Sequence, residues 1–353
     1  MSGLLECSLA FQPEERTQII NISEKVKAEV GDALDAYPRT FYCSFHTTAG
    51  YADQHLMDRL RHDEANLRAY IGSFQHIFPQ HGPYRHDQLH LRTELSEDQR
   101  TIEPRNADSH LTFISSGLEN CVTYEHRPET PVYFVELDGI NDNDDNNPRL
   151  RKTRVIGFND SRRVHRQRIP IEMASHQMDS VNLRDRRLGF IEQLDEIIQR
   201  LGLPVGRVEI SLADDERNTG LTVNEYETLL MRHDLIDVLK NPLQFMAERG
   251  ASMLRDPLAI PEKARNYAKY DLVHLVNRLV EKLGWSESVI ERAIDKMLAM
   301  PASRLLRMKR SVNMLISEGG RVCPGTYQSP ILVQWRRAPE NVRYLDVQFF
   351  LFE

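Results

Sequence analysis

Histidine side chains are the first candidates for chemistry in this sequence. The N-terminal half contains His46, His86 and His110, separated by 40 and then 24 residues. Imidazole is the commonest neutral ligand for zinc and related metals, and three protein ligands with an open fourth position are typical of a catalytic zinc site. Such a metal activates water or polarises a phosphoryl or carbonyl oxygen. The spacing matches no compact metal motif, so scattered surface or core histidines are the alternative interpretation.

Three further polar residues are candidates for catalysis. Asp87 directly follows His86, where it can orient the ring or act as a general base; a solvated turn carboxylate is the alternative. Glu225 precedes an amphipathic segment and is either an acid–base group or a first-turn glutamate favoured by the helix dipole. Gln328 can hydrogen-bond a ligand, or it can belong simply to the start of a strand.

A basic run of residues follows an acidic loop near the middle of the chain. It contains Arg149, Arg151, Lys152 and Arg154 on a predicted strand, so alternate members share one face. Arginines on a face turned toward a pocket bind phosphate well. A charged face exposed to solvent is the alternative interpretation.

Composition limits the class of protein. The 353 residues suffice for two domains, and 41% hydrophobic residues is typical of a globular chain. A formal net charge of −7 disfavours nucleic-acid binding, which needs a basic surface. The four cysteines are scattered without a CxxC pair, and no secretory signal or long apolar run is visible. We therefore expect a cytoplasmic protein without a membrane span.

The order of predicted elements repeats along the chain. Amphipathic helices are expected at 56–71 and 227–239, and they contain the same tripeptide, Arg61-His62-Asp63 and Arg232-His233-Asp234. We predict an α+β fold of two tandem β-rich domains, with mixed sheets packed against helices. Their expected bounds are 1–160 and 171–353, joined by a linker at 161–170, with a helical insertion at about 242–308 in the second domain.

Several ordered motifs resemble the YjbQ-type family, whose members are described as secondary thiamine-phosphate synthase-like. In the first half these are His46-Thr47-Thr48-Ala49-Gly50, Tyr84-Arg85-His86-Asp87 and Asn106-Ala107-Asp108-Ser109-His110. In the second half they are Gly220-Leu221-Thr222-Val223-Asn224-Glu225 and Gly325-Thr326-Tyr327-Gln328. The first half lacks the motifs that the second keeps, and the second has no counterpart of the three histidines.

The resemblance implies a composite site. The first copy supplies His46, His86 and His110 for a divalent metal, most simply zinc, with manganese or iron as alternatives. The second copy supplies Glu225 and Gln328. Family members are similar in forming trimers with sites near subunit contacts, so we expect a homo-oligomer with sites at domain or subunit interfaces.

The function expected from the resemblance is that of a metal-dependent enzyme, a transferase, lyase or hydrolase, acting on a small anionic or phosphorylated metabolite. Thiamine-phosphate synthesis is implied by the resemblance alone, because fold and site analogy do not fix a reaction. A specialised biosynthetic lyase or hydrolase on the same scaffold is one alternative. A non-catalytic ligand-binding or assembly protein is another.

Overall fold

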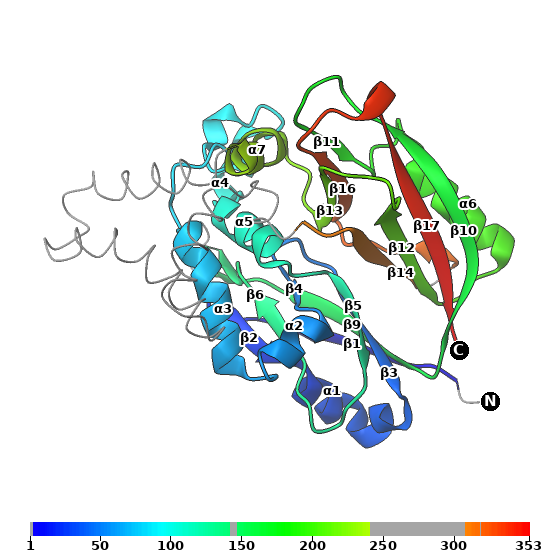
Figure 1. Cartoon of the computed structure of the whole chain (residues 1–353). Helices are drawn as coiled ribbons and strands as arrows, with labels where there is room; N and C mark the ends of the chain where they lie inside the picture. The colour runs from blue at the N-terminus through cyan, green and yellow to red at the C-terminus, as the bar shows by residue number, and fades with distance from the viewer. Residues whose placement is uncertain (1–2, 142–146, 241–307, 318) are drawn as a thin grey trace, which may run out of the picture.

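The computed structural model describes residues 3–141, 147–240, 308–317 and 319–353, and within them the chain has a mixed α+β fold (Figure 1). The predicted fold class is therefore confirmed. The helical insertion predicted at about 242–308 lies, but for residue 308, outside the described residues. No helix in the described ranges is long and apolar enough to cross a membrane.

Two antiparallel sheets form the first half. The larger has the strand order β1-β9-β3-β5, and the smaller has the order β2-β6-β4. Their bounds are Leu5–Phe11 (β1), Gln18–Asn21 (β2), Arg39–Ser44 (β3), Ala49–Tyr51 (β4), Cys121–Glu125 (β5), Tyr133–Glu136 (β6) and Arg151–Phe158 (β9). Along β1 the buried side chains alternate, with Cys7 and Leu9 facing the core, because successive side chains of a strand point to opposite faces. The short strands β7 (Ile140–Asn141) and β8 (Asn147–Pro148) pair antiparallel with each other.

The second half repeats this strand order. Its larger sheet runs β10-β17-β12-β14-β15 and its smaller sheet runs β11-β16-β13. The bounds are Ser161–Glu172 (β10), Asp179–Asn182 (β11), Gly206–Leu212 (β12), Thr219–Asn224 (β13), Ser311–Ser317 (β14), Arg321–Val322 (β15), Ser329–Gln334 (β16) and Val342–Phe352 (β17). In each half the first strand pairs with the last, antiparallel. This match is consistent with a duplicated unit, and common descent of the halves stays a prediction.

Helices pack between and around these sheets. They are α1 (Ile22–Val30), α2 (Gln54–Arg59), α3 (Glu64–Ile77), α4 (Glu97–Ile102), α5 (Ala107–Ser116), α6 (Phe190–Leu201) and α7 (Leu235–Lys240), with a π-helical turn at Leu230–Asp234. Figure 1 shows the two halves side by side, with α5 and α7 near each other.

Apolar side chains join the two halves directly. Leu111 of α5 belongs to the same buried cluster as Leu230 and Leu235 of the second half. At another contact Phe158 of β9 stacks on Phe352 of β17, with ring centroids 4.3 Å apart. Because this surface is removed from water, the halves are held together by burial as well as by the chain.

The prediction of a linker at 161–170 is wrong. These residues belong to β10, which pairs with β17 along its length and is an edge strand of its sheet. An edge strand exposes much of its surface, so it tolerates a polar, basic sequence. Proline is also tolerated there, because an edge strand pairs on one side only and the missing N–H of Pro170 need not donate to a second neighbouring strand. The halves are instead separated by the turn at Asn159 and Asp160 between β9 and β10.

The single helix predicted at 56–71 is also wrong. The chain forms α2 and α3 there, with a break in which Arg61 and His62 adopt positive φ values of 60° and 49°. Asp63 begins α3 as its N-cap, since its carboxylate accepts the N–H of Asn66 at 2.8 Å. The capping carboxylate therefore sets the boundary between α2 and α3. The apolar stripe continues across this boundary and gives no sign of it.

Candidate functional site

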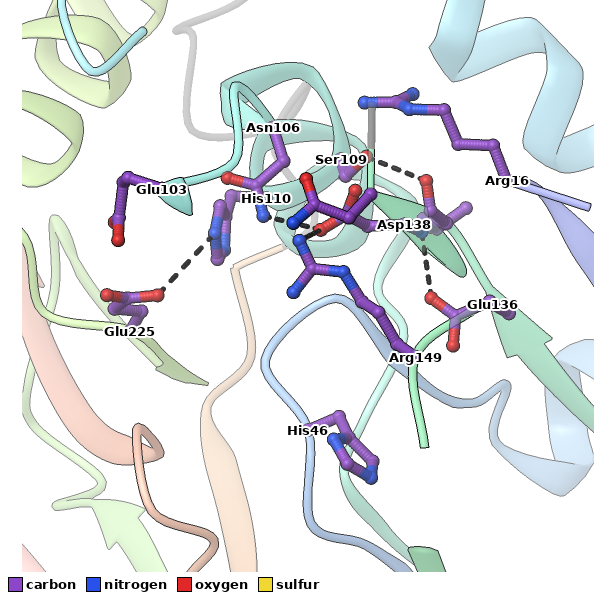
Figure 2. A network of polar contacts seen from close by, with 12 residues as sticks. Arg16, His46, Glu103, Asn106, Ser109, His110, Glu136, Asp138, Arg149 and Glu225 are labelled. Atoms are coloured by element: carbon purple, nitrogen blue, oxygen red, sulfur yellow. Dashed lines mark hydrogen bonds and ion pairs between the residues drawn. The ribbon is translucent and has the colours of Figure 1, made fainter. Parts of the chain in front are cut away.

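The candidate site lies where α5 meets the loop that follows β13. Every residue of α5 is buried, including His110 at 0% exposure. The end of β13 brings Asn224 against this helix, and the loop after it brings Glu225. Figure 2 shows Glu225 pointing toward His110. The site is thus built from both halves of one chain.

The His110 ring is held in one tautomer by an amide. Its Nδ1 lies 2.6 Å from Oδ1 of Asn224, and the Asn224 Nδ2 donates to the carbonyl of Thr47 at 3.0 Å. Because that second bond fixes the amide, Oδ1 must accept and His110 Nδ1 must carry the proton. Its Nε2 therefore bears a lone pair. This atom is buried without a hydrogen-bond partner among the described residues, and it lies 3.8 Å from Oε2 of Glu225.

Burial and the charge on His86 lower the pKa of His110 to about 3, so its ring is neutral at neutral pH. Burial also raises the pKa of Glu225. The side chain of Glu225 keeps 26% of its surface exposed, whereas that of His110 keeps only 1%. The pair therefore combines a neutral acceptor with a carboxyl group that retains its proton more readily than usual.

His86 has the opposite character. Its Nδ1 lies 3.0 Å from Oε2 of Glu227, and its Nε2 lies 3.2 Å from Oδ1 of Asn106. The Asn106 amide nitrogen donates to Asp138 at 2.6 Å, so its oxygen must face His86. Both ring nitrogens therefore donate, which defines an imidazolium. Burial opposes this charge, but the hydrogen bond to Glu227 and the negative charge of Asp87 outweigh it and raise the pKa of His86.

The second half also positions the backbone on which His86 sits. The carboxylate of Asp234 accepts the N–H groups of Arg85 at 3.0 Å and of His86 at 2.9 Å. Asp87 accepts the N–H of Ala107 at 3.1 Å, in the first turn of α5. Burial raises the pKa of Asp87 to about 6. Asp87 thus holds the start of α5, and its predicted catalytic role stays a prediction.

His46 lies apart from the other two rings. Its Nε2 accepts the backbone N–H of Lys152 at 2.7 Å, and Figure 2 shows it well separated from His110. Burial and the charge of Arg151 lower the pKa of His46 to about 3. Gln328 donates its amide to the carbonyl of His46 at 2.9 Å, so it holds the backbone of this loop.

The three histidines do not form a metal-ligand group in this arrangement. His86 donates from both nitrogens, and the Nε2 lone pair of His46 already accepts a backbone N–H. Of the three rings, His110 alone presents a lone pair that has no partner within the part of the chain that the structure describes. The described ranges contain no group of three or more His, Cys, Asp or Glu side chains placed to hold a metal. The residues therefore do not fit a three-histidine site, and zinc, manganese or iron binding stays a prediction.

Arg149 is a partly exposed cation at the site. Its Nη2 lies 3.0 Å from Oδ2 of Asp138 as an ion pair, yet neither this atom nor Nε has a partner in hydrogen-bonding geometry among the described residues. Its side chain is 26% exposed. By contrast Arg151 is buried and binds the buried Glu136 through two nitrogens. Of these two arginines, Arg149 is the more exposed, and its Nε and Nη2 are buried without hydrogen-bond partners among the described residues.

Two residues at this site were not singled out from the sequence. Glu227 and Asn106 determine the charge of His86, but each depends on contacts between segments far apart in the chain. Glu227 could have been found from the sequence, because it lies three residues after the buried strand that ends at Asn224. Asn106 lies within the motif that ends at His110.

Comparison with known proteins gives a distant likeness. No protein-family model matches the chain, and no curated protein is significantly similar to it. A YbjQ-like protein of unknown function from Sulfolobus solfataricus P2 is 16% identical with a TM-score of 0.30, and the match covers 54% of this chain and 99% of that one. A conserved yjbq-family protein from Clostridium acetobutylicum is 12% identical with a TM-score of 0.25, over 52% and 98%.

A hypothetical protein from Aeropyrum pernix K1 is 13% identical with a TM-score of 0.29, and the match covers 54% of this chain and all of that one. The solved structures that resemble this chain thus include proteins of the family that its motifs resemble, each spanning about half of it. The likeness is too distant to assign a reaction.

We expect acid to destabilise the chain through His110. Its pKa is about 3 when folded against an ordinary 6.5, so the unfolded state binds the proton first and stability falls with pH across this window. Each such group contributes about 1.4 kcal/mol per pH unit. We therefore expect the free energy of unfolding, measured in urea between about pH 7 and about pH 4, to fall less steeply with pH in His110→Gln, by about that amount per pH unit. The exposed control His90→Gln should keep the wild-type slope; three equal slopes would contradict the neutral assignment.

Replacing Glu227 should be strongly destabilising. Glu227→Gln leaves a buried imidazolium without its counter-charge, and breaking such a pair costs about 3–5 kcal/mol of the free energy of unfolding. A matched control is Asp58→Asn, because Asp58 lies 2.9 Å from His62 but is 42% exposed, where solvent screens the pair. Equal losses in the two variants would mean that His86 is not charged.

Proposed function

We propose that the chain is an enzyme that acts on a small anionic metabolite at the junction of its two halves. In this proposal Glu225 transfers the proton, His110 accepts a hydrogen bond from the substrate, and Arg149 binds its negative charge. The observation that supports it most is the buried Nε2 of His110, which has no partner among the described residues and lies 3.8 Å from the carboxyl group of Glu225.

The surroundings lower the pKa of His110 and raise the pKa of Glu225, and these opposite shifts determine what each group can do. A histidine with a pKa of about 3 is a weak base but a reliable neutral acceptor, suited to a substrate hydroxyl or ammonium group. A carboxyl group with a raised pKa is a better proton carrier near neutral pH than an ordinary glutamate. Pairs of groups whose pKa values are pushed apart are typical of acid–base sites.

Arg149 supports the anionic character of the substrate. Its guanidinium is oriented by Asp138 and still has Nε and Nη2 free of hydrogen bonds among the described residues. Charged donors of this kind bind phosphate and carboxylate groups with good geometry. Asp87 and Gln328 serve this proposal by positioning α5 and the His46 loop. A phosphorylated substrate of thiamine-phosphate synthesis would be one example of this class.

The test begins with a thermal-shift screen of phosphorylated and carboxylated metabolites, followed by turnover assays on the compounds that bind. Glu225→Gln should lower kcat by about 10²–10⁴-fold with little change in binding, because it removes the proton carrier. Arg149→Met should instead raise KM. The exposed control Glu64→Gln should behave as wild type.

Three outcomes would contradict the proposal. Full turnover in Glu225→Gln removes its acid–base role. Binding that depends on Arg149 without turnover of any compound favours the non-catalytic ligand-binding protein. Near-stoichiometric metal in the purified chain, lost in each of His46→Ala, His86→Ala and His110→Ala, would replace the proposal with the three-histidine metal site.

A further inference from the structure

Two cysteines far apart in the sequence lie opposite each other in the larger sheet of the first half. Cys43 of β3 pairs directly with Cys121 of β5, and their Sγ atoms are 3.2 Å apart. Both side chains are buried, at 2% and 4% exposure. Nothing in the proposed acid–base chemistry uses them.

The backbone pattern makes this pair a suitable position for a disulfide. The N–H of Ser44 donates to the carbonyl of the opposing Asn120 at 2.7 Å, which makes Ser44 and Asn120 a hydrogen-bonded pair. Pairs alternate along an antiparallel ladder, so Cys43 and Cys121 form a non-hydrogen-bonded pair. At such pairs the Cα atoms are about 4.5 Å apart, within the range of about 4.4–6.8 Å that disulfides span.

We infer that Cys43 and Cys121 are an oxidation site, at which the two thiols form a reversible disulfide with a small peroxide as the oxidant. Each thiol gives up one hydrogen, the S–S bond forms, and the O–O bond of the peroxide breaks to give two molecules of water when the oxidant is hydrogen peroxide. A small, uncharged oxidant is required because Phe41, Phe158 and Leu315 pack around the pair in one buried cluster. A thiol reductant reverses the reaction by exchange.

The position of the bond gives it a consequence for the candidate site. The two cysteines are 78 residues apart, and the segment that they would close contains His46, His86 and His110. Cys43 lies just before the loop that contains His46. The carbonyl of His46 accepts hydrogen bonds from the side-chain amides of Gln328 and of Asn120, which precedes Cys121. Oxidation would therefore fasten the loop of His46 to the strand that follows α5.

Peptide mapping of the full-length chain tests this inference. The native protein is treated with hydrogen peroxide, its remaining thiols are alkylated, and it is digested without reductant. We expect a cross-linked peptide pair containing Cys43 and Cys121, a mass lower by two hydrogen atoms, and reversal by dithiothreitol. The double variant Cys7→Ser/Cys323→Ser should form the same bond, and Cys43→Ser should not.

A second measurement covers the energetic effect. Closing so long a loop should raise the melting temperature of the oxidised chain by roughly 5 °C, and Cys43→Ala/Cys121→Ala should show no such rise. Oxygen addition to the thiols without a cross-link would overturn the inference. So would a bond that uses Cys323 instead, or an oxidised chain that melts at or below the temperature of the reduced one.

Discussion

His86 and His110 lie with their ring centroids 5.6 Å apart and their planes at 78° in the interior of the protein. Two imidazolium ions at that separation would repel strongly, because the interior screens charge far less than water. The chain resolves this constraint by giving the two rings different partners. Glu227 and Asn106 surround His86 with acceptors, while Asn224 leaves His110 neutral, with an Nε2 lone pair that no described residue uses.

The same constraint explains why the two halves depend on each other. Asn224, Glu225, Glu227 and Asp234 come from the second half, yet all four act on residues of the first. From His86 the hydrogen bonds continue through Asn106 to Asp138, which is also ion-paired with Arg149. Figure 2 shows Asn106, Asp138 and Arg149 close together. His86, Asn106, Asp138 and Arg149 therefore form one polar network, and such networks hold a unique arrangement when their members are satisfied.

Much of the fold was predictable, because alternating buried residues mark strands such as β1 and β12 without knowledge of their neighbours. The errors arose where tertiary context decides. A basic, proline-containing stretch became the edge strand β10, and a continuous apolar stripe was broken by the cap at Asp63. At the site, the residue types predicted roles for His110 and Glu225. Only the fold shows that the Nε2 lone pair of His46 already accepts the N–H of Lys152.

Residues of the second half fix the proton positions on His86 and His110 of the first half. The most direct measurement is a ¹⁵N–¹H spectrum of the ring nitrogens in histidine-labelled protein at neutral pH, assigned with single substitutions. We expect His86 to be protonated on both nitrogens and His110 to be protonated on Nδ1 alone. A His86 ring with an unprotonated nitrogen, or a His110 ring protonated on Nε2, would contradict it.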